Sequence, residues 1–134
     1  MSDNGPFDLT RRFAHLGLGA RAVAEPEFTG IDWYEGYGAR HADDGAEGRF
    51  VALHRFAESW DSWEMHPAGD ELVLCIAGEI TLIQEAPDGS EHRIRLTRGE
   101  YAINPPGTWH TADIDAPAEA LFITAGEGTQ HRAR

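Results

Sequence analysis

Four side chains in the second half of the sequence have the types and the spacing of a metal-binding site. Glu64 and His66 stand two residues apart in a strand-like run, so both side chains leave the same face of a sheet. Glu71 opens the next run, and His110 follows a Pro-Pro-Gly turn further along the chain. Imidazole nitrogens and carboxylate oxygens on neighbouring strands can converge on one divalent ion. A hydrogen-bonded polar cluster without a metal is the alternative interpretation of the same residues.

The elements that must position these side chains are short strands, each closed by turn residues. The predicted strands are residues 50–56, 63–66, 71–76, 79–85, 92–96, 101–103, 109–113 and 120–124. The Asp88-Gly89 step is the strongest hairpin signal in the chain. No helical period of useful length follows residue 20, which argues against a parallel α/β sheet. Seven or eight short strands predict a sandwich or a barrel.

The chain is long enough for one domain and shows no internal repeat. We expect three parts: an N-terminal arm or cover over residues 1–47, a β domain over 48–125, and a C-terminal tail over 126–134. Within the arm, the spacing of apolar residues predicts a short helix over 8–16, with Asp8 as its cap. Residues 31–37 alternate in the manner of a strand with one aromatic face.

The charge balance excludes two classes of partner. The 134-residue chain carries 11 Lys and Arg against 23 Asp and Glu, which gives a net charge of −12. Nucleic acids and anionic membrane surfaces bind basic faces, so neither is expected as a partner. No apolar stretch reaches the roughly 18 residues of a transmembrane helix. The first residues also lack the pattern of a signal peptide, so the sequence predicts a cytoplasmic protein.

The residues around both groups of candidate ligands resemble the two sequence motifs of the cupin family. The first motif has His-x-His, then Glu, then Gly, and its positions here are Glu64-Met65-His66, Glu71 and Gly78. The second motif has Gly, then Pro-x-Gly, then His, and Gly99, Pro105-Pro106-Gly107 and His110 match it at every spacing. The resemblance covers about residues 48–125 and implies an all-β fold, a double-stranded β-helix or jelly roll that follows the arm.

This chain departs from the cupin pattern at three positions. Glu64 replaces the first His, Glu58 replaces a leading Gly, and Ile114 replaces a closing Asn. The Glu64 change alters the charge of the site, because two carboxylates neutralise a divalent ion, whereas the usual three-His, one-Glu set leaves about +1. A neutral site polarises bound water less. In a second arrangement Glu64 turns away and leaves two His and one carboxylate.

The resemblance implies one divalent transition-metal ion, which the mixed ligand set allows to be Fe, Mn, Ni, Co or Zn. Cupins that share these motifs include dioxygenases, isomerases, decarboxylases and non-catalytic binders. We therefore expect a metal-dependent enzyme acting on a small organic metabolite, and the alternative is a cupin that binds or senses a metal or small molecule without catalysis. A vestigial site is a third interpretation.

Several further residues are candidates for the same pocket. His54 and Glu64 are candidate catalytic bases, although a hydrogen-bonded core position is the alternative for His54. Trp63 and Trp109 flank the ligand strands and are expected to line the pocket, with ordinary packing as the alternative. Cys75 shares a strand face with Glu71 and points toward the cavity, and an inert core residue is its alternative interpretation.

The opposite face of the 71–76 strand carries an outward apolar row, formed by Leu72, Leu74 and Ile76. Such a row needs a cover, either from the N-terminal arm or from a second subunit. Cupins commonly dimerise through such surfaces, so the resemblance implies a homodimer.

Overall fold

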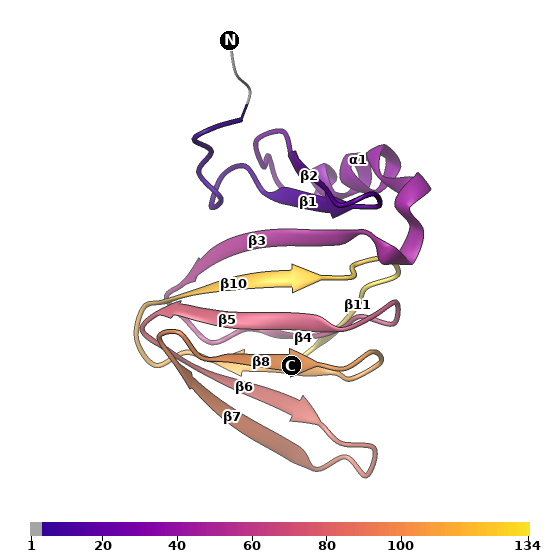
Figure 1. The fold of residues 1–134 in the computed structure, drawn as a ribbon. Helices are drawn as coiled ribbons and strands as arrows, with labels where there is room; N and C mark the ends of the chain where they lie inside the picture. Colours follow the sequence, from indigo (N-terminus) through magenta and orange to yellow (C-terminus); the bar gives the residue numbers. More distant parts are fainter. Residues whose placement is uncertain (1–3) are drawn as a thin grey trace.

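Two antiparallel sheets face each other in the computed structural model, which describes residues 4–134 (Figure 1). One sheet has the strand order β2-β1-β3-β10-β5-β8, and the other has the order β11-β4-β9-β6-β7. The strands are β1 (Ala14–Gly17), β2 (Arg21–Ala24), β3 (Arg49–Phe56), β4 (Ser62–Met65), β5 (Glu71–Ala77), β6 (Glu79–Glu85), β7 (Glu91–Thr97), β8 (Tyr101–Asn104), β9 (His110–Asp113), β10 (Ala118–Thr124) and β11 (Gln130–Ala133). The expected all-β sandwich is confirmed.

The core lies between the two sheets because each strand alternates inward and outward side chains. On β5, Val73 and Cys75 are buried, while Leu72 and Leu74 between them are only half-buried. Leu82 of β6 is fully buried in the facing sheet. The eight strands predicted between residues 50 and 124 correspond to β3 through β10, with ends that differ by at most two residues.

The predicted helix over residues 8–16 is wrong. Asp8 does cap a turn, since its carboxylate accepts a hydrogen bond from the Thr10 backbone N–H at 2.9 Å and its carbonyl accepts one from Arg12 at 2.8 Å. The chain then enters β1, which pairs with β2 and β3 and extends the six-stranded sheet. Tertiary pairing along β3 outweighs a local spacing that was too short to hold a helix.

The predicted strand over residues 31–37 is also wrong, and so is the expectation of no helix beyond residue 20. The segment forms α1 (Asp32–Arg40), followed by a 3₁₀ helix, η1 (Ala42–Glu47). Trp33 and Tyr37 alternate as strand residues would, but they are also four apart and share a helix face. Their rings stack at 5.5 Å, and Trp33 packs edge-on against Phe13. The aromatic face therefore covers the inner side of the extended sheet.

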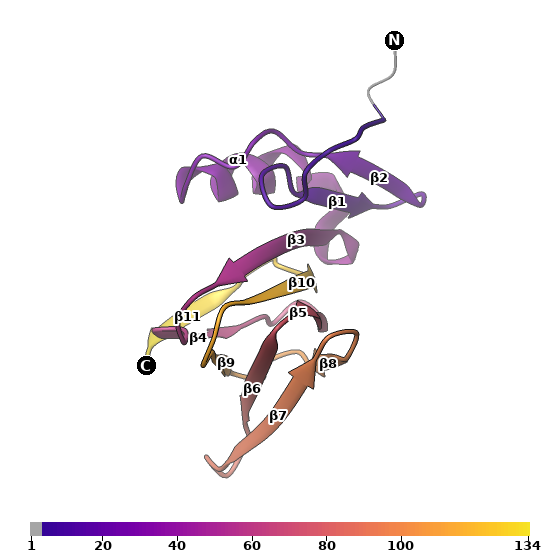
Figure 2. The ribbon, with the colours of Figure 1, turned by 90° about the vertical axis from the view of Figure 1, so that its left-hand side faces the viewer.

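The C-terminal tail contains a strand that the sequence pattern did not indicate. β11 pairs with β4, with Gln130 opposite Met65 and His131 opposite Glu64. Figure 2 shows β11 beside β4 at the edge of the five-stranded sheet. No helix among the described residues is long and apolar enough to cross a membrane.

Candidate metal site

The four candidate ligands meet between the sheets, at the end where β5 begins and β10 finishes. Glu64 of β4 lies directly opposite His110 of β9, and His66 follows β4. Nε2 of His66 and Nε2 of His110 each lie 3.1 Å from an oxygen of Glu71. Oε1 of Glu64 lies 4.0 Å from Nε2 of His110. His66, Glu71 and His110 are 5%, 3% and 0% exposed, so the cluster is buried.

The hydrogen bonds of the two imidazoles fix which nitrogen faces the cluster. The Thr129 hydroxyl donates to the Gly126 carbonyl at 2.8 Å, so it accepts from Nδ1 of His66 at 2.7 Å. Nδ1 of His110 donates to the Thr108 carbonyl at 3.3 Å. In the neutral rings Nε2 is therefore a bare lone pair. Both Nε2 atoms are buried, each faces a Glu71 oxygen at 3.1 Å, and in the neutral rings neither has a hydrogen-bond donor to accept from.

Glu71 is held in place through both of its oxygens. The Asn104 side-chain amide donates to Oε1 at 3.0 Å, and the Thr124 hydroxyl donates to Oε2 at 2.6 Å. Burial alone would raise the pKa of the Glu71 carboxyl, but when Nε2 of His110 and of His66 carry protons, their hydrogen bonds and positive charge outweigh burial and hold that pKa far below its usual range. The carboxylate is therefore anionic and preoriented.

These donors fit a divalent cation. Two bare nitrogens and an anionic carboxylate in one buried space repel each other unless a cation lies among them. Burial alone lowers the pKa of His66, yet Glu71 and Glu64 outweigh it and raise that pKa, which shows the pull of the cluster on positive charge. Ligand atoms of Glu64, His66 and His110 lie within 4.8 Å of one another. The set offers nitrogen and oxygen donors in the mixture that transition metals accept.

Glu64 differs from the other three residues because its side chain is 27% exposed. Its Oε2 lies 3.0 Å from Nε2 of His131, while Oε1 faces His110. Burial raises the pKa of the Tyr34 hydroxyl, and the negative charge of Glu64 raises that pKa further. Glu64 is thus the member of the cluster that reaches the solvent side.

His54 lies outside the cluster, on the inner face of β3. Its ring packs against Phe13 and Phe122 at centroid distances of 5.3 and 5.7 Å. Burial lowers the pKa of His54, although Glu64 and Glu71 partly oppose this. The His54 ring is therefore neutral at pH 7. Its role as a catalytic base stays a prediction.

The structure places Trp63 and Trp109 away from the cluster. Both alternate with ligand residues, so they leave the opposite face of the five-stranded sheet. There they flank Arg132, whose guanidinium lies 5.1 Å from the Trp63 ring and 4.6 Å from the Trp109 ring. Cys75 points inward but sits in the apolar core, where burial raises the pKa of its thiol.

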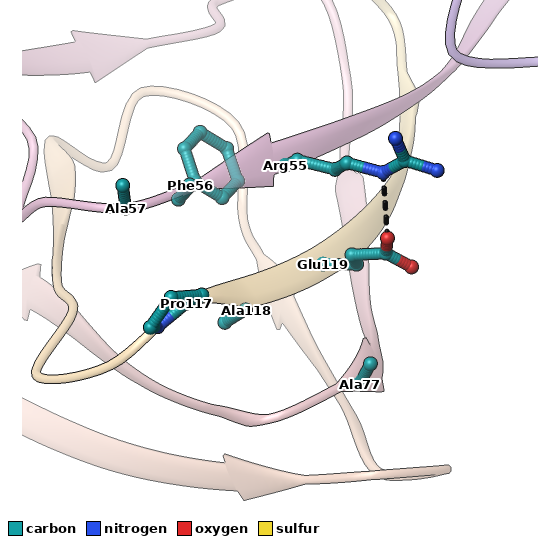
Figure 3. A pocket seen from close by; sticks show the side chains of 7 residues that line it. All are labelled: Arg55, Phe56, Ala57, Ala77, Pro117, Ala118 and Glu119. Atoms are coloured by element: carbon teal, nitrogen blue, oxygen red, sulfur yellow. Dashed lines mark hydrogen bonds and ion pairs between the residues drawn. The ribbon is translucent and has the colours of Figure 1, made fainter.

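One surface depression, of about 360 Å³, lies at the other end of β5 and β10 (Figure 3). Its lining residues are Arg55, Phe56, Ala57, Ala77, Pro117, Ala118 and Glu119. Arg55 and Glu119 form an ion pair across it at 2.7 Å. Ala77 and Glu71 stand at opposite ends of β5, so this depression is not part of the candidate metal site.

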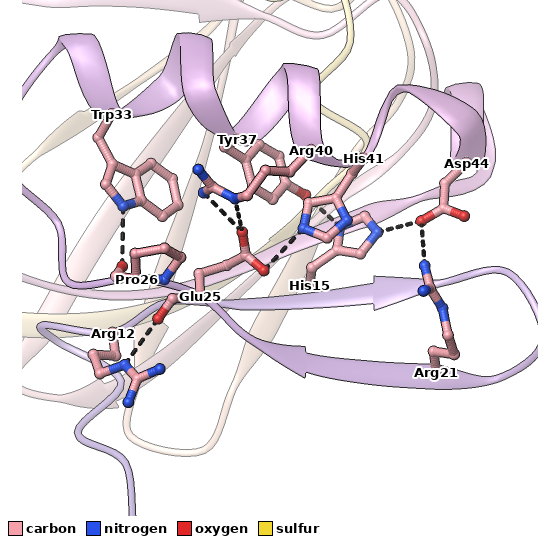
Figure 4. A network of polar contacts seen from close by, with 10 residues as sticks. All are labelled: Arg12, His15, Arg21, Glu25, Pro26, Trp33, Tyr37, Arg40, His41 and Asp44. Atoms are coloured by element: carbon pink, nitrogen blue, oxygen red, sulfur yellow. Dashed lines mark hydrogen bonds and ion pairs between the residues drawn. The ribbon is translucent and has the colours of Figure 1, made fainter. Parts of the chain in front are cut away.

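A second polar cluster ties the N-terminal arm to α1 and η1 (Figure 4). His15 bonds Tyr37 and Asp44, both at 2.6 Å, and His41 bonds Glu25 at 2.9 Å. Ligand atoms of His15, His41 and Asp44 lie close enough together to hold a metal.

The geometry of this second cluster nevertheless argues against a metal. The rings of His15 and His41 stack at 3.7 Å with an interplanar angle of 15°, so their in-plane lone pairs run side by side and do not converge. The Arg21 guanidinium, 3.1 Å from Asp44, already supplies the positive charge. We interpret this cluster as a buried polar network that fixes the arm.

The comparison of the chain with protein families agrees with the geometry of the buried His and Glu cluster. The family profile of the cupin domain (Cupin_2) matches residues 55–129, which is more than half of the chain. The chain belongs to the cupin family. No curated protein matches it closely enough to count as a relative.

Solved structures of other cupins share the fold at low sequence identity. An oxalate oxidase matches with a TM-score of 0.53 and 17% identity, over 60% of this chain and 44% of its own. A variant of oxalate decarboxylase from Bacillus subtilis matches with a TM-score of 0.52 and 19% identity, over 63% of this chain and 23% of its own. A cupin from Desulfitobacterium hafniense DCB-2 matches with a TM-score of 0.50 and 22% identity, over 59% and 68%. This cupin thus spans less than half of the oxalate oxidase chain.

Four residues that hold the ligands escaped the sequence analysis: Asn104, Thr124, Thr129 and His131. Asn104 and Thr124 lie opposite Glu71 on the two strands that flank it. Only the strand order reveals that proximity, because the three residues are far apart in the sequence.

Proposed function

We propose that this cupin binds one divalent transition-metal ion through His66, His110, Glu71 and Glu64, and uses it in a reaction of a small organic metabolite. The observation that carries the proposal is the pair of buried, bare Nε2 atoms that face the Glu71 carboxylate. Each of the four ligand residues also forms a hydrogen bond to a neighbouring group that orients it, as in other metal sites with histidine ligands.

A bound ion would supply Lewis acidity, together with redox chemistry if it is iron or manganese. Glu64 is the candidate base, because its carboxylate is partly exposed and reaches the solvent side of the cluster. Glu64 and Glu71 together neutralise a divalent charge, so the site would hold an organic acid by direct ligation more than by net attraction. Two structural neighbours bear oxalate in their names, which supports a small organic acid as the substrate class.

A non-catalytic binding or sensing role is the second candidate. It is favoured by the burial of His66, Glu71 and His110, each 5% exposed or less, since a nearly closed site leaves little access for a substrate. Turnover of a small organic acid by the loaded protein would favour the enzyme. Tight ligand or metal binding without turnover would favour the binding module.

We also propose that this cupin pairs with a second copy of itself through the outer face of its six-stranded sheet. Two apolar rows cross β10, β5 and β8 there: Ile123, Leu72 and Ile103 in one, and Leu121, Leu74 and Tyr101 in the other. In the described part of the N-terminal arm, the aromatic cluster around Trp33 lies on the other, inner side of this sheet, where it packs with Phe13 and Ala52.

The size of this outer face suits a dimer. The four neighbouring strands β3, β10, β5 and β8, about 4.8 Å apart and with residues rising about 3.4 Å each, give a flat face of roughly 20 by 24 Å, or about 480 Å². A standard interface buries about 800 Å² per partner, so this would be a small interface, to which the protruding side chains add area. Ile103 and Tyr101 are 51% and 59% exposed at its edge.

The metal proposal is tested by elemental mass spectrometry on protein purified without an affinity metal column. We expect about one equivalent of a transition metal in the wild-type protein and its loss in His66→Ala. His92→Ala is the matched control, because His92 is exposed on β7, two strands from His110 in the five-stranded sheet. Absence of metal from the wild-type protein, even after reconstitution, would show that the proposal is wrong.

A further inference from the structure

We propose that His131 positions Glu64 as a metal ligand, an inference that rests on the proposed metal-binding function. The family profile ends at residue 129, so His131 lies beyond the part of the chain that the family match describes. Glu64 in turn stands where the cupin motif has a His. Glu64 thus departs from the motif, His131 lies outside the matched range, and the two side chains contact each other at 3.0 Å.

Strand pairing brings the two side chains together. β11 pairs antiparallel with β4, and His131 is the residue directly opposite Glu64. Directly opposed residues of an antiparallel pair have Cβ atoms about 5 Å apart and leave the same face of the sheet. His110 lies opposite Glu64 on the other side, in β9. Glu64 is thus flanked by one imidazole on each neighbouring strand.

The contacts of Glu64 divide its two oxygens between these neighbours. Oε2 accepts a hydrogen bond from Nε2 of His131, which leaves Oε1 directed toward Nε2 of His110. A free glutamate at a partly exposed position has several rotamers, and ordering it for an ion costs side-chain entropy. The hydrogen bond from His131 already restricts these rotamers in the metal-free protein. It also leaves Oε1 as the Glu64 oxygen that is directed into the cluster.

Thr129 acts on the neighbouring ligand from the same C-terminal segment. Thr129 stands two residues before His131, the residue that contacts Glu64. The Thr129 hydroxyl accepts a hydrogen bond from Nδ1 of His66 and so orients that ring. The segment 126–133 therefore orients two of the four ligands of the site. We infer that the end of the chain is part of the site and not a dispensable tail.

The test is a titration of the metal-free protein with Co²⁺, followed by its visible absorption bands. We expect His131→Ala to weaken Co²⁺ binding by about 10- to 100-fold, the usual effect of losing a group that orients a ligand, and to change the shape of the bands. His131→Gln keeps an N–H donor and should restore both. His131 is 59% exposed, so its replacement leaves the core intact, and His92→Ala is the exposed-histidine control.

A second comparison separates positioning from a general effect on stability. In a Glu64→Ala background, His131→Ala should cause no further loss of Co²⁺ affinity, because its effect acts through Glu64. Equal Co²⁺ affinity and equal spectra in wild type and His131→Ala would overturn the inference alone, and so would an undiminished effect in the Glu64→Ala background. If the wild-type protein binds no Co²⁺, the proposed function itself is wrong and the inference falls with it.

Discussion

Replacing Thr124 by Val isolates the hydrogen bond that holds the buried Glu71 carboxylate. Thr124 is 5% exposed, and its hydroxyl donates to Oε2 of Glu71 at 2.6 Å. Valine keeps the branched shape and removes only the donor. A hydrogen bond to a charged group contributes about 1.5–3 kcal/mol. We therefore expect the free energy of unfolding of the metal-free protein to fall by about that amount, which is roughly a 10- to 100-fold change in the folding equilibrium.

Thr111→Val is the matched control for this prediction. Thr111 is fully buried, and its hydroxyl donates at 2.8 Å to the uncharged Ser62 carbonyl, so its loss should cost only about 0.5–1.5 kcal/mol. The assay is urea unfolding of both variants at pH 7 in the presence of a chelator. If Thr124→Val destabilises the protein no more than Thr111→Val, Glu71 is not held as a buried anion and the electrostatic account of the site is wrong.

Three further predictions concern the ligand orientation, the dimer and the arm. Thr129→Val should weaken Co²⁺ binding about 10- to 100-fold, while Thr129→Ser retains it, as measured by titration; equal affinity in both variants would refute the role of the hydroxyl. If the protein pairs as proposed, Ile103→Lys should convert it to a monomer in sedimentation velocity, and a wild-type monomer would remove the dimer proposal. The hydrogen bond from His15 lowers the pKa of Asp44, so the stabilisation that Asp44 provides is present above its unfolded pKa of about 4 and is lost as the pH falls further. Asp44→Asn should accordingly show a shallower loss of unfolding free energy between pH 5 and 3 than wild type, and equal slopes would contradict this.

Alternation along the chain is clearest in the longer strands of the two sheets. β6 extends over seven residues with buried Ile80 and Leu82 on one face, and its ends were predicted correctly. In the arm the same rule failed, because Trp33 and Tyr37 satisfy both a two-residue and a four-residue spacing. Packing of both rings against the extended sheet decides between the two structures, and no local pattern contains that information.

The same distinction applies to the candidate site. The sequence motifs identify the ligand residues, whereas only the fold shows which residues orient them. The four predicted ligands do converge, because the motifs place each of them at or next to the end of a strand. The groups that orient them come from strands whose neighbours are set by the sheet order: Thr124 and Asn104 flank Glu71, and His131 faces Glu64. A substitution at a ligand position is therefore read most reliably together with the residue opposite it on the next strand. By that argument Glu64, which departs from the cupin pattern, and His131 of β11 form one feature of the site. Glu64 brings an added negative charge and a carboxylate that can rotate, and His131 supplies the hydrogen-bond donor that orients this carboxylate.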